Sequence, residues 1–526
     1  MVLLTLPIST CFRVAVVATI VCFVADASPP SPHIVFVIVD DMGFNDVGYH
    51  SNDSEIETPV LDDLAGRGVK LENYYVAPLC TPTRSMLLTG RYLIHNGQQH
   101  LVIDPVKPRC LPLDDATLAD KLTEANYSTH MVGKWHLGFY KKACWPMNRG
   151  FQSFFGKLLG SGDHFSHNVT HKNNAGGRCG HDFTGMDLRD GETNVQPDYE
   201  GVYSTEIFTE WAQKIIRSHN ADESLFLYLA YQAPHLPIQV PDSYAYPRNI
   251  IKNKDRRYYA GMISYLDESI GNLIDTLEWW GLWNDTVFVF TSDNGGVGGK
   301  NAGSNWPLRG AKGNYFEGGI RTVGFITSPL LPASVRGTTS TALMHVSDWF
   351  PTLLEGVAGA TINETELQLD GVNMWDTITN GTSGSDDREI VYNIDPLMRR
   401  PSSIDPKYDN QSLIFDVGIQ AAIRRGDMKL ITGYQADTDW FPTFESGLSD
   451  VSANDPAGKA VWLFNITADP LEENDLSDSM GDVVDDLLGR LWDYYNSTRF
   501  VPPVNERKDC DSDPALHGDL WTCWEC

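Results

Sequence analysis

The stretch His33-Ile34-Val35-Phe36-Val37-Ile38-Val39-Asp40-Asp41, HIVFVIVDD, decides the fold class of this chain of 526 residues. It is a continuous apolar run rich in β-branched residues, which is typical of a strand buried on both faces of a parallel sheet. Three further stretches share this character: STHMVGKWH (128–136), SLFLYLAYQAPH (224–235) and TVFVFTSDNGG (286–296). Helical patterns, such as residues 58–69 and 258–281, lie between them. Strands that alternate with helices predict an α/β domain with a mostly parallel sheet.

Each of the four strands is followed by polar residues. These are Asp40 and Asp41 after the first strand, Lys134 and His136 after the second, His235 after the third, and Asp293 and Asn294 after the fourth. In open α/β sheets, ligands bind at the carboxyl ends of the strands. We therefore expect these residues, which are far apart in the sequence, to converge at one edge of the sheet.

The converging side chains suggest a metal and an anion. Asp40, Asp41, Asp293 and Asn294 offer hard oxygen ligands, which favour Ca²⁺ or Mg²⁺ over zinc. Either pair alone would more often be a helix cap or a turn. The Gly-rich segment NWPLRGAKGNYFEGGIR (305–321) adds Lys312. Cationic and proton-donating groups beside a metal suit a tetrahedral oxyanion such as sulfate or phosphate; those here are Lys134, His136, His235 and Lys312.

The N-terminus predicts entry into the secretory pathway. Arg13 precedes an apolar run (14–24) and Ala25-Asp26-Ala27, so residues 1–27 are expected to be a signal peptide, too short to span a bilayer. No later segment reaches spanning length, and a formal net charge of −29 argues against nucleic acid as a partner. N-glycosylation sequons support secretory transit; they occur at Asn52, Asn126, Asn168, Asn284, Asn363, Asn380, Asn410, Asn465 and Asn496.

The cysteine count draws attention to Cys80. Cys11 and Cys22 belong to the signal peptide, and the odd remainder indicates one cysteine with another fate. Cys80 stands in LCTPTRSMLLTGR (79–91), where Pro82 suits the first turn of a helix. A thiol at a helix N-terminus is expected to have a lowered pKa. A buried structural thiol or a half-cystine remains possible on this argument.

The pattern changes after about residue 390. Residues 420–434 read as a hairpin with Gly426-Asp427 at the turn, residues 459–470 as a further strand, and residues 483–500 as a helix. Strands followed by a helix predict a smaller α+β domain over 391–526, after a catalytic domain over 32–390. The polar stretch 380–387 is a candidate linker or surface loop.

Several motifs together resemble the sulfatase family. CTPTRSMLLTGR resembles its signature, Cys-x-Pro-x-Arg followed by a leucine-rich segment and Thr-Gly-Arg. Further blocks follow in the family's order: VDDMGFNDVG (39–48), GKWHLG (133–138), TSDNGG (291–296) and RGAKGNYFEGGIR (309–321). The resemblance runs from about residue 32 to about 510. Stretches such as FGKLLGSGDHFSH (155–167) and LFNITADPLEENDL (463–476) are similar to the arylsulfatase B branch, the N-acetylgalactosamine-4-sulfatases.

The resemblance implies a fold, a modification and a set of roles. The fold would be alkaline-phosphatase-like, with a smaller C-terminal domain carrying an antiparallel sheet. Cys80 would be oxidised to Cα-formylglycine by the formylglycine-generating enzyme, although Thr83 replaces the commoner serine of the signature. The hydrated aldehyde would attack sulfur and then release sulfate by collapsing to the aldehyde. The metal would be one Ca²⁺, bound by Asp40, Asp41, Cys80, Asp293 and Asn294.

The remaining roles are also implied by the resemblance. Arg84 and Lys134 would stabilise the hydrate, and His136 would hydrogen-bond it. Lys134, His235 and Lys312 would bind the substrate sulfate, and His235 or Lys312 would protonate the leaving oxygen. Cys110 and Cys144 match one disulfide of the family, whereas the partners of Cys179, Cys510, Cys523 and Cys526 stay open. Trp306 and Tyr392 are candidate specificity residues.

The resemblance implies a secreted or lysosomal sulfatase acting on the 4-sulfate of N-acetylgalactosamine at glycosaminoglycan ends. The alternative within the family is a sulfatase of small sulfate esters, such as aryl sulfates or glucosinolates. A phosphohydrolase of the same superfold would instead need a Ser or Thr nucleophile and a two-zinc site richer in histidine. A non-catalytic binder of sulfated glycans would have lost site residues, and none is missing.

Overall fold

The computed structural model describes residues 31–526 except 52–55, 174–178, 249, 299–302, 386, 400–413, 444–445 and 457. The expected signal peptide and the sequons at Asn52 and Asn410 lie outside the described residues. Within those ranges, no helix has both the length and the apolar character that crossing a membrane requires.

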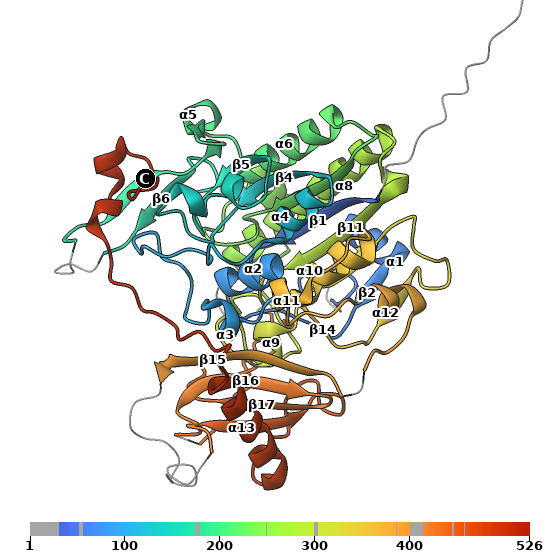
Figure 1. Ribbon diagram of the computed structural model, residues 1–526, viewed down its shortest axis with the longest axis vertical. Coiled ribbons are helices and arrows are strands. Elements are labelled where there is room, and N and C mark those ends of the chain that lie inside the picture. Colours follow the sequence, from blue (N-terminus) through green and yellow to red (C-terminus); the bar gives the residue numbers. More distant parts are fainter. Residues whose placement is uncertain are drawn as a thin grey trace, which may run out of the picture.

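A ten-stranded sheet forms the body of the protein (Figure 1). Its centre is five parallel strands in the order β11-β1-β10-β4-β5. Their bounds are β1 (His33–Val39), β4 (Tyr127–Lys134), β5 (Ser153–Lys157), β10 (Ser224–Ala230) and β11 (Thr286–Ser292). The edges are completed by β2 (Val69–Leu71), β8 (Arg189–Asp190), β9 (Thr193–Asn194), β12 (Gly324–Thr327) and β13 (Thr338–Ser340). The predicted α/β class, with a mostly parallel central sheet, is confirmed.

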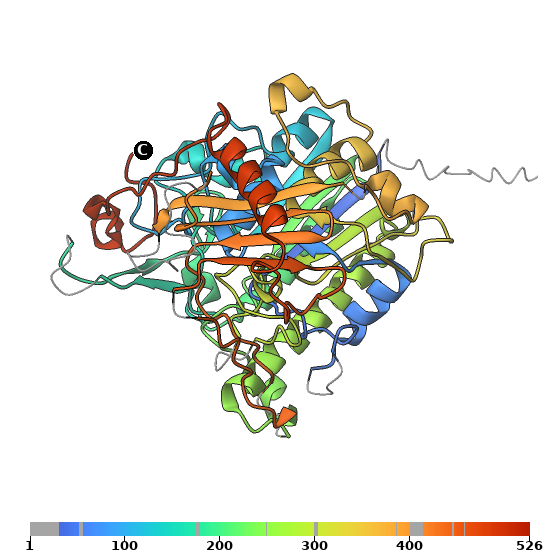
Figure 2. The ribbon, with the colours of Figure 1, turned by 90° about the horizontal axis from the view of Figure 1, so that it is seen from below.

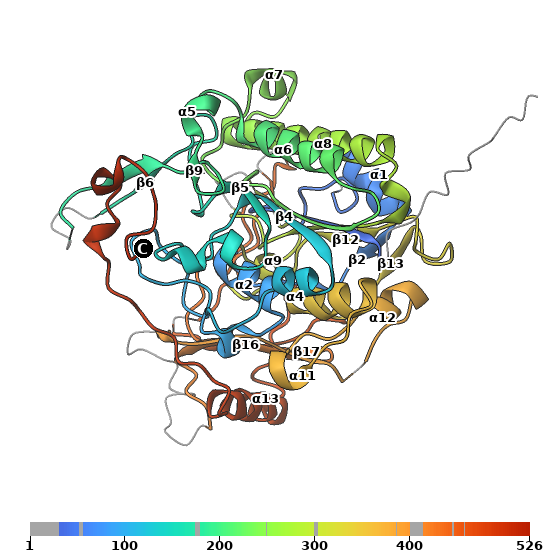
Figure 3. The same cartoon turned by 45° about the horizontal axis from the view of Figure 1, so that its top comes forward.

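Helices cover both faces of this sheet, which explains why β1, β10 and β11 are buried along their whole length (Figures 1 and 3). Val35, Val37 and Val39 pack on the side of α1 (Pro59–Arg67), α6 (Ser204–Ser218) and α8 (Lys254–Trp279). The alternate residues of β1 pack on the side of α2 (Cys80–Thr89), α4 (Leu118–Glu124) and α10 (Trp349–Pro351). A strand with two buried faces needs the unbroken apolar run seen in the sequence.

A second sheet of four antiparallel strands lies against this body. It contains β15 (Glu389–Arg399), β16 (Ile419–Arg425), β17 (Met428–Thr432) and β18 (Val461–Asn465), with the expected Gly426-Asp427 turn between β16 and β17. Helix α13 (Gly481–Tyr495) crosses its outer face (Figure 2). Its residues share one apolar cluster with Tyr75 and Phe316 of the body. The small sheet is therefore held between α13 and the large domain.

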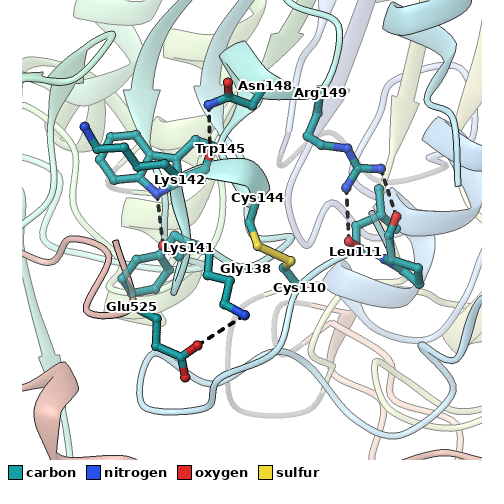
Figure 4. The surroundings of a disulfide bond; sticks show 12 residues. Cys110, Leu111, Gly138, Lys141, Lys142, Cys144, Trp145, Asn148, Arg149 and Glu525 are labelled. Carbon is teal, nitrogen blue, oxygen red and sulfur yellow. Dashed lines mark hydrogen bonds and ion pairs between the residues drawn. A yellow bond between two sulfur atoms is a disulfide. The ribbon is translucent and has the colours of Figure 1, made fainter. Parts of the chain in front are cut away.

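The last residues return from the small sheet to the body (Figure 1). The disulfide Cys179–Cys510 joins residues 331 positions apart in the sequence, and Cys523 pairs with Cys526. Trp521 is fully buried, and its indole N–H donates to the Val169 carbonyl at 3.0 Å. This tail, residues 510–526, also reaches the surroundings of the Cys110–Cys144 disulfide, where Glu525 pairs with Lys141 (Figure 4).

The described sequon asparagines are nearly all accessible. Asn465 is half-buried, and the others are exposed: Asn126, Asn168, Asn284, Asn363, Asn380 and Asn496. Glycosylation at these positions stays a prediction.

Candidate active site

The polar residues that follow the central strands do converge at one edge of the sheet. Asp40 and Asp41 follow β1 directly, Lys134 ends β4, and Asp293 and Asn294 follow β11. Helix α2 begins at the same place with Cys80, as Pro82 predicts. The Cys80 sulfur lies 3.3 Å from Asp40 Oδ1 and 3.6 Å from Lys312 Nζ.

Ion pairs join these segments to one another and to the loop that carries Lys312. Lys134 pairs with Asp40, and Lys312 pairs with Asp41. The Arg84 guanidinium donates twice to Asp293 Oδ2, at 3.0 and 2.8 Å, and once to the Lys134 carbonyl at 3.1 Å. Removing one partner of a buried ion pair destabilises a protein strongly, because the other charge is left uncompensated. Each of these charged side chains therefore holds its partner in position.

Local structure explains how α2 presents Cys80. All ten residues of the helix are buried, and it ends at Gly90, whose φ of 65° suits glycine. Thr81 Oγ1 donates to the His136 carbonyl at 2.9 Å, which binds the helix N-terminus to the segment after β4. Thr83 Oγ1 accepts from the Ala77 N–H at 2.9 Å, a contact that serine would also make. The replacement of serine in the signature therefore leaves the helix start intact.

The expected lowering of the Cys80 pKa is wrong. Burial raises the pKa of the Cys80 thiol, and the neighbouring Asp293 and Asp40 carboxylates raise it further. Lys134 and Lys312 act in the opposite direction but do not compensate. A helix N-terminus contributes about half a positive charge, which lowers a thiol pKa. In a buried site this effect is smaller than the opposite effect of two nearby carboxylates. The encoded thiol is thus a poor nucleophile.

The pKa values of the two buried carboxyl groups, Asp40 and Asp293, are shifted in opposite directions. Burial disfavours ionisation of Asp40, but Lys134, His235, Arg84 and Lys312 outweigh it and hold the Asp40 pKa well below its usual value. Burial and the adjacent Asp40 raise the pKa of Asp293 to about 6, despite Arg84. Two acidic groups in one buried site push their pKa values apart in this way, and an added cation would favour the charged form of both.

The pKa values of both histidines of the site are lowered. Burial, with Lys134 and Arg84 nearby, holds the pKa of His136 well below its usual value. Burial also lowers the pKa of His235, although Asp40 and Asp41 oppose this. His235 Nδ1 lies 2.7 Å from the Leu236 carbonyl, which can only accept, so Nδ1 carries the hydrogen. His235 Nε2 then faces the site, 3.6 Å from Asp41 Oδ2.

The donor set fits a hard cation. Ligand atoms of Asp40, Asp41, Cys80 and His235 all lie within 4.8 Å of one another. Asp41 Oδ2 and Asn294 Oδ1 are buried and have no hydrogen-bond partner in the described part of the chain. Asn294 Nδ2 donates to Asp41 Oδ1 at 2.7 Å, which leaves its carbonyl oxygen free. Unpaired buried oxygens are costly, and an oxygen-binding cation would satisfy them.

Of the two candidate specificity residues, Tyr392 is excluded. It is 0% exposed and packs on Tyr75, so it cannot contact a substrate, whereas Trp306 is half-buried. The apolar run around Tyr392 is now explained as the core strand β15. Sequence reasoning also missed three buried polar residues behind His235, namely Lys157, His164 and Gln232. Their only signal was that Lys157 and His164 stand in FGKLLGSGDHFSH.

Comparison with known proteins adds independent observations. The profile described as Sulfatase matches residues 32–360. Arylsulfatase J of Mus musculus is 46% identical over 95% of this chain and 81% of its own length. N-acetylgalactosamine-6-sulfatase of Homo sapiens is 30% identical over 70% of this chain and 69% of its own. The crystal structure of Ps i-CgsB in complex with k-i-k-neocarrahexaose superposes with a TM-score of 0.72 and 28% identity, covering 93% of this chain and 98% of the other.

Proposed function

Because this chain belongs to the sulfatase family and is a sulfuric ester hydrolase, we propose that it removes the 4-sulfate of N-acetylgalactosamine at glycosaminoglycan ends. One observation carries the activity: a free, buried Cys80 at the start of α2 lies within hydrogen-bond range of both Asp40 and Lys312. The choice of sugar rests on the motifs shared with the arylsulfatase B branch. An N-acetylgalactosamine-sulfatase among the relatives and a neighbour bound to an oligosaccharide support it.

We propose that Cys80 acts as Cα-formylglycine, made by the formylglycine-generating enzyme in the secretory pathway. The hydrated aldehyde would supply a hydroxyl nucleophile and a means of releasing sulfate. The raised thiol pKa supports this, because the unmodified residue is suited neither to attack nor to metal binding. The protein would then act in the lysosome or outside the cell.

A calcium ion would be held by Asp40, Asp41, residue 80, Asp293 and Asn294, and would supply positive charge next to the sulfate oxygens. The unpartnered oxygens of Asp41 and Asn294 support this assignment. His235 is close enough to contribute or to stand beside the ion.

The chain's own cations would bind and orient the substrate. Burial alone would lower the pKa of Lys312, but Asp41 holds it above its usual value, so Lys312 stays charged and offsets negative charge on sulfate. Lys134 would do the same from β4, while Arg84 and His136 would hold residue 80. The neutral His235 ring carries its hydrogen on Nδ1, which is committed to the Leu236 carbonyl, so only the imidazolium form has a proton on Nε2. We assign proton donation to the leaving oxygen to Nε2 of this charged form.

The test is sulfate release by the secreted protein from two substrates. One is a chondroitin oligosaccharide with a terminal 4-sulfated N-acetylgalactosamine, and the other is a glucosinolate. Release from the oligosaccharide is the expected result. Release from the glucosinolate alone would overturn the proposed sugar substrate and leave a sulfatase of small esters.

A further inference from the structure

Behind His235 lies a chain of three buried polar side chains that the catalytic roles above do not use. Lys157 is 4% exposed, Gln232 is 2% exposed and His164 is 0% exposed. Lys157 ends β5 and stands opposite Lys134 of β4 in the sheet register. The chain therefore begins directly beside the catalytic edge of the sheet.

Lys157 is a buried cation that forms no ion pair with a carboxylate among the residues that the structure describes. Its ammonium donates to Gln232 Oε1 at 2.6 Å, and Asp187, the carboxylate that affects it most, forms no ion pair with it. Burial lowers the pKa of Lys157 to about 8 in spite of Asp187, so at neutral and acidic pH it is charged. A buried charge that is held by a neutral amide is unfavourable for folding. Its presence calls for an explanation outside stability.

The ammonium fixes the orientation of the Gln232 amide. Because an ammonium can only donate, it requires Oε1 on its own side and turns Nε2 the other way. Gln232 Nε2 then donates to the Gly162 carbonyl at 2.5 Å and lies 3.1 Å from His164 Nε2. Reversing the amide would set two donors against each other.

Gln232 and His164 hold both backbone polar groups of His235. The Gln232 carbonyl accepts from the His235 N–H at 2.9 Å. His164 Nε2 lies 3.1 Å from the His235 carbonyl, and its Nδ1 lies 2.7 Å from Ser204 Oγ. With Ser204 donating to Nδ1, the neutral ring donates from Nε2 to the His235 carbonyl, and Gln232 Nε2, itself a donor, contacts this ring nitrogen without a hydrogen bond between them. The backbone from which the His235 imidazole projects is thus held from the β5 side.

We propose that Lys157 is a positioning residue: through Gln232 and His164 it aims His235 Nε2 at the leaving oxygen of the sulfate ester. The inference rests on the proposed role of His235 as proton donor. It has a selective consequence, because an alkoxide of a sugar is a poor leaving group that needs the proton, whereas an aryl oxide leaves without it. Disturbing Lys157 should therefore affect sugar sulfates more than aryl sulfates.

The test compares wild type with Lys157→Met on a 4-sulfated N-acetylgalactosamine glycoside and on 4-nitrophenyl sulfate. We expect kcat/KM on the sugar sulfate to fall on the order of 10- to 100-fold, and on the aryl sulfate less than about threefold. Activities are normalised to the fraction of residue 80 present as formylglycine, measured by peptide mass spectrometry. Lys142→Met is the matched control, since Lys142 is an exposed lysine paired with Glu192.

A double variant tests whether Lys157 acts on His235 through Gln232. Because Lys157 acts through Gln232, Lys157→Met combined with Gln232→Leu should be no worse than the poorer single variant. If Lys157→Met is not secreted, Gln232→Glu replaces it, since it keeps the buried charge paired and removes only the Nε2 contacts, and the same selective loss is expected. Equal losses on both substrates, no loss, or additive effects would overturn the inference. An inactive wild type would instead refute the proposed function.

Discussion

At the scale of single residues, the site combines an unreactive thiol with surroundings that favour an anion. The Cys80 pKa is raised, yet two lysines, an arginine and a histidine act on the adjacent Asp40 strongly enough to hold its pKa far down. Such surroundings stabilise negative charge on a bound group rather than on sulfur. The residue that the gene encodes and the residue that functions are therefore expected to differ.

Cys80→Ala should abolish sulfate release, with a loss on the order of 10³-fold or more, because it removes the proposed nucleophile. Hydrolysis of 4-nitrophenyl sulfate measures this, and thermal unfolding checks that the fold is kept. Full hydrolysis by the variant would refute the assignment of Cys80.

Asp41→Asn should reduce the calcium content of the purified protein, because it removes charge from a carboxylate with an unpartnered buried oxygen. Elemental analysis after dialysis is expected to give about one calcium per wild-type chain and clearly less for the variant. Asp63→Asn, on the exposed face of α1, is the matched control. Retention of wild-type calcium in Asp41→Asn would contradict the ligand set.

At the scale of elements, the central strands have different chemistry at their two ends. Site residues follow β1 and end β4, whereas His33 begins β1 and His130 lies on β4 near His219. Burial, and then His219, lower the pKa of both His33 and His130 to about 4. The unfolded chain therefore binds protons at these positions that the native protein does not.

Stability should fall as the pH decreases from about 6.5 to about 4. A histidine with a lowered native pKa contributes its full stability above the unfolded pKa and loses it as the pH falls toward the native one. Denaturant unfolding at pH 7, 5.5 and 4.5 should show a loss of roughly 3 to 5 kcal/mol between the first and the last pH. His33→Gln should flatten this dependence and His517→Gln, a change at a half-buried histidine of the C-terminal tail, should not. If the unfolding free energy of His33→Gln fell with decreasing pH as steeply as that of the wild type, His33 would not be a cause of the loss.

The elements also show what sequence patterns can and cannot reveal. Residues such as Asp40 and Asp293 could be placed together because parallel strands bring their carboxyl ends to one edge. The direction of the Cys80 pKa shift could not be predicted, because the burial of Cys80 depends on contacts that α2 makes with segments distant in the sequence. Lys157 was missed for the same reason: a lysine after a strand usually reaches solvent, and only the packing of residues 162–164 and 232 encloses it.

At the scale of the whole molecule, the segment between β17 and β18 of the small domain supports the loop that carries Lys312. The loop that carries Lys312 is held by Arg309, which is 2% exposed. Its guanidinium donates to the Thr438 carbonyl at 2.7 Å and to Asp455 at 2.6 Å, both in the C-terminal part of the chain. It also lies 4.1 Å from the ring centroid of Phe316. The second domain thereby fixes a cation of the first.

Arg309→Met should raise KM for sulfate esters about tenfold and lower the free energy of unfolding by about 2 kcal/mol. Lys312 loses its fixed position, and Asp455 loses its partner. Steady-state kinetics and denaturant unfolding measure the two effects. Arg67→Met, which removes an exposed pair with Asp63, is the control. An unchanged KM together with reduced stability would show that the contacts of Arg309 stabilise the fold without acting on the site.

The burial of α2 also determines when Cys80 can be modified during biosynthesis. Cys80 is 2% exposed in a helix without an exposed residue, so an oxidising enzyme cannot reach it once the protein has folded. Cys510, which closes the longest disulfide loop, is translated roughly 20 to 90 s after Cys80. The proposed oxidation has to finish before the N-terminal half collapses around the helix. Slow maturation is then an advantage, and a variant that folds faster would yield more protein but fewer active molecules.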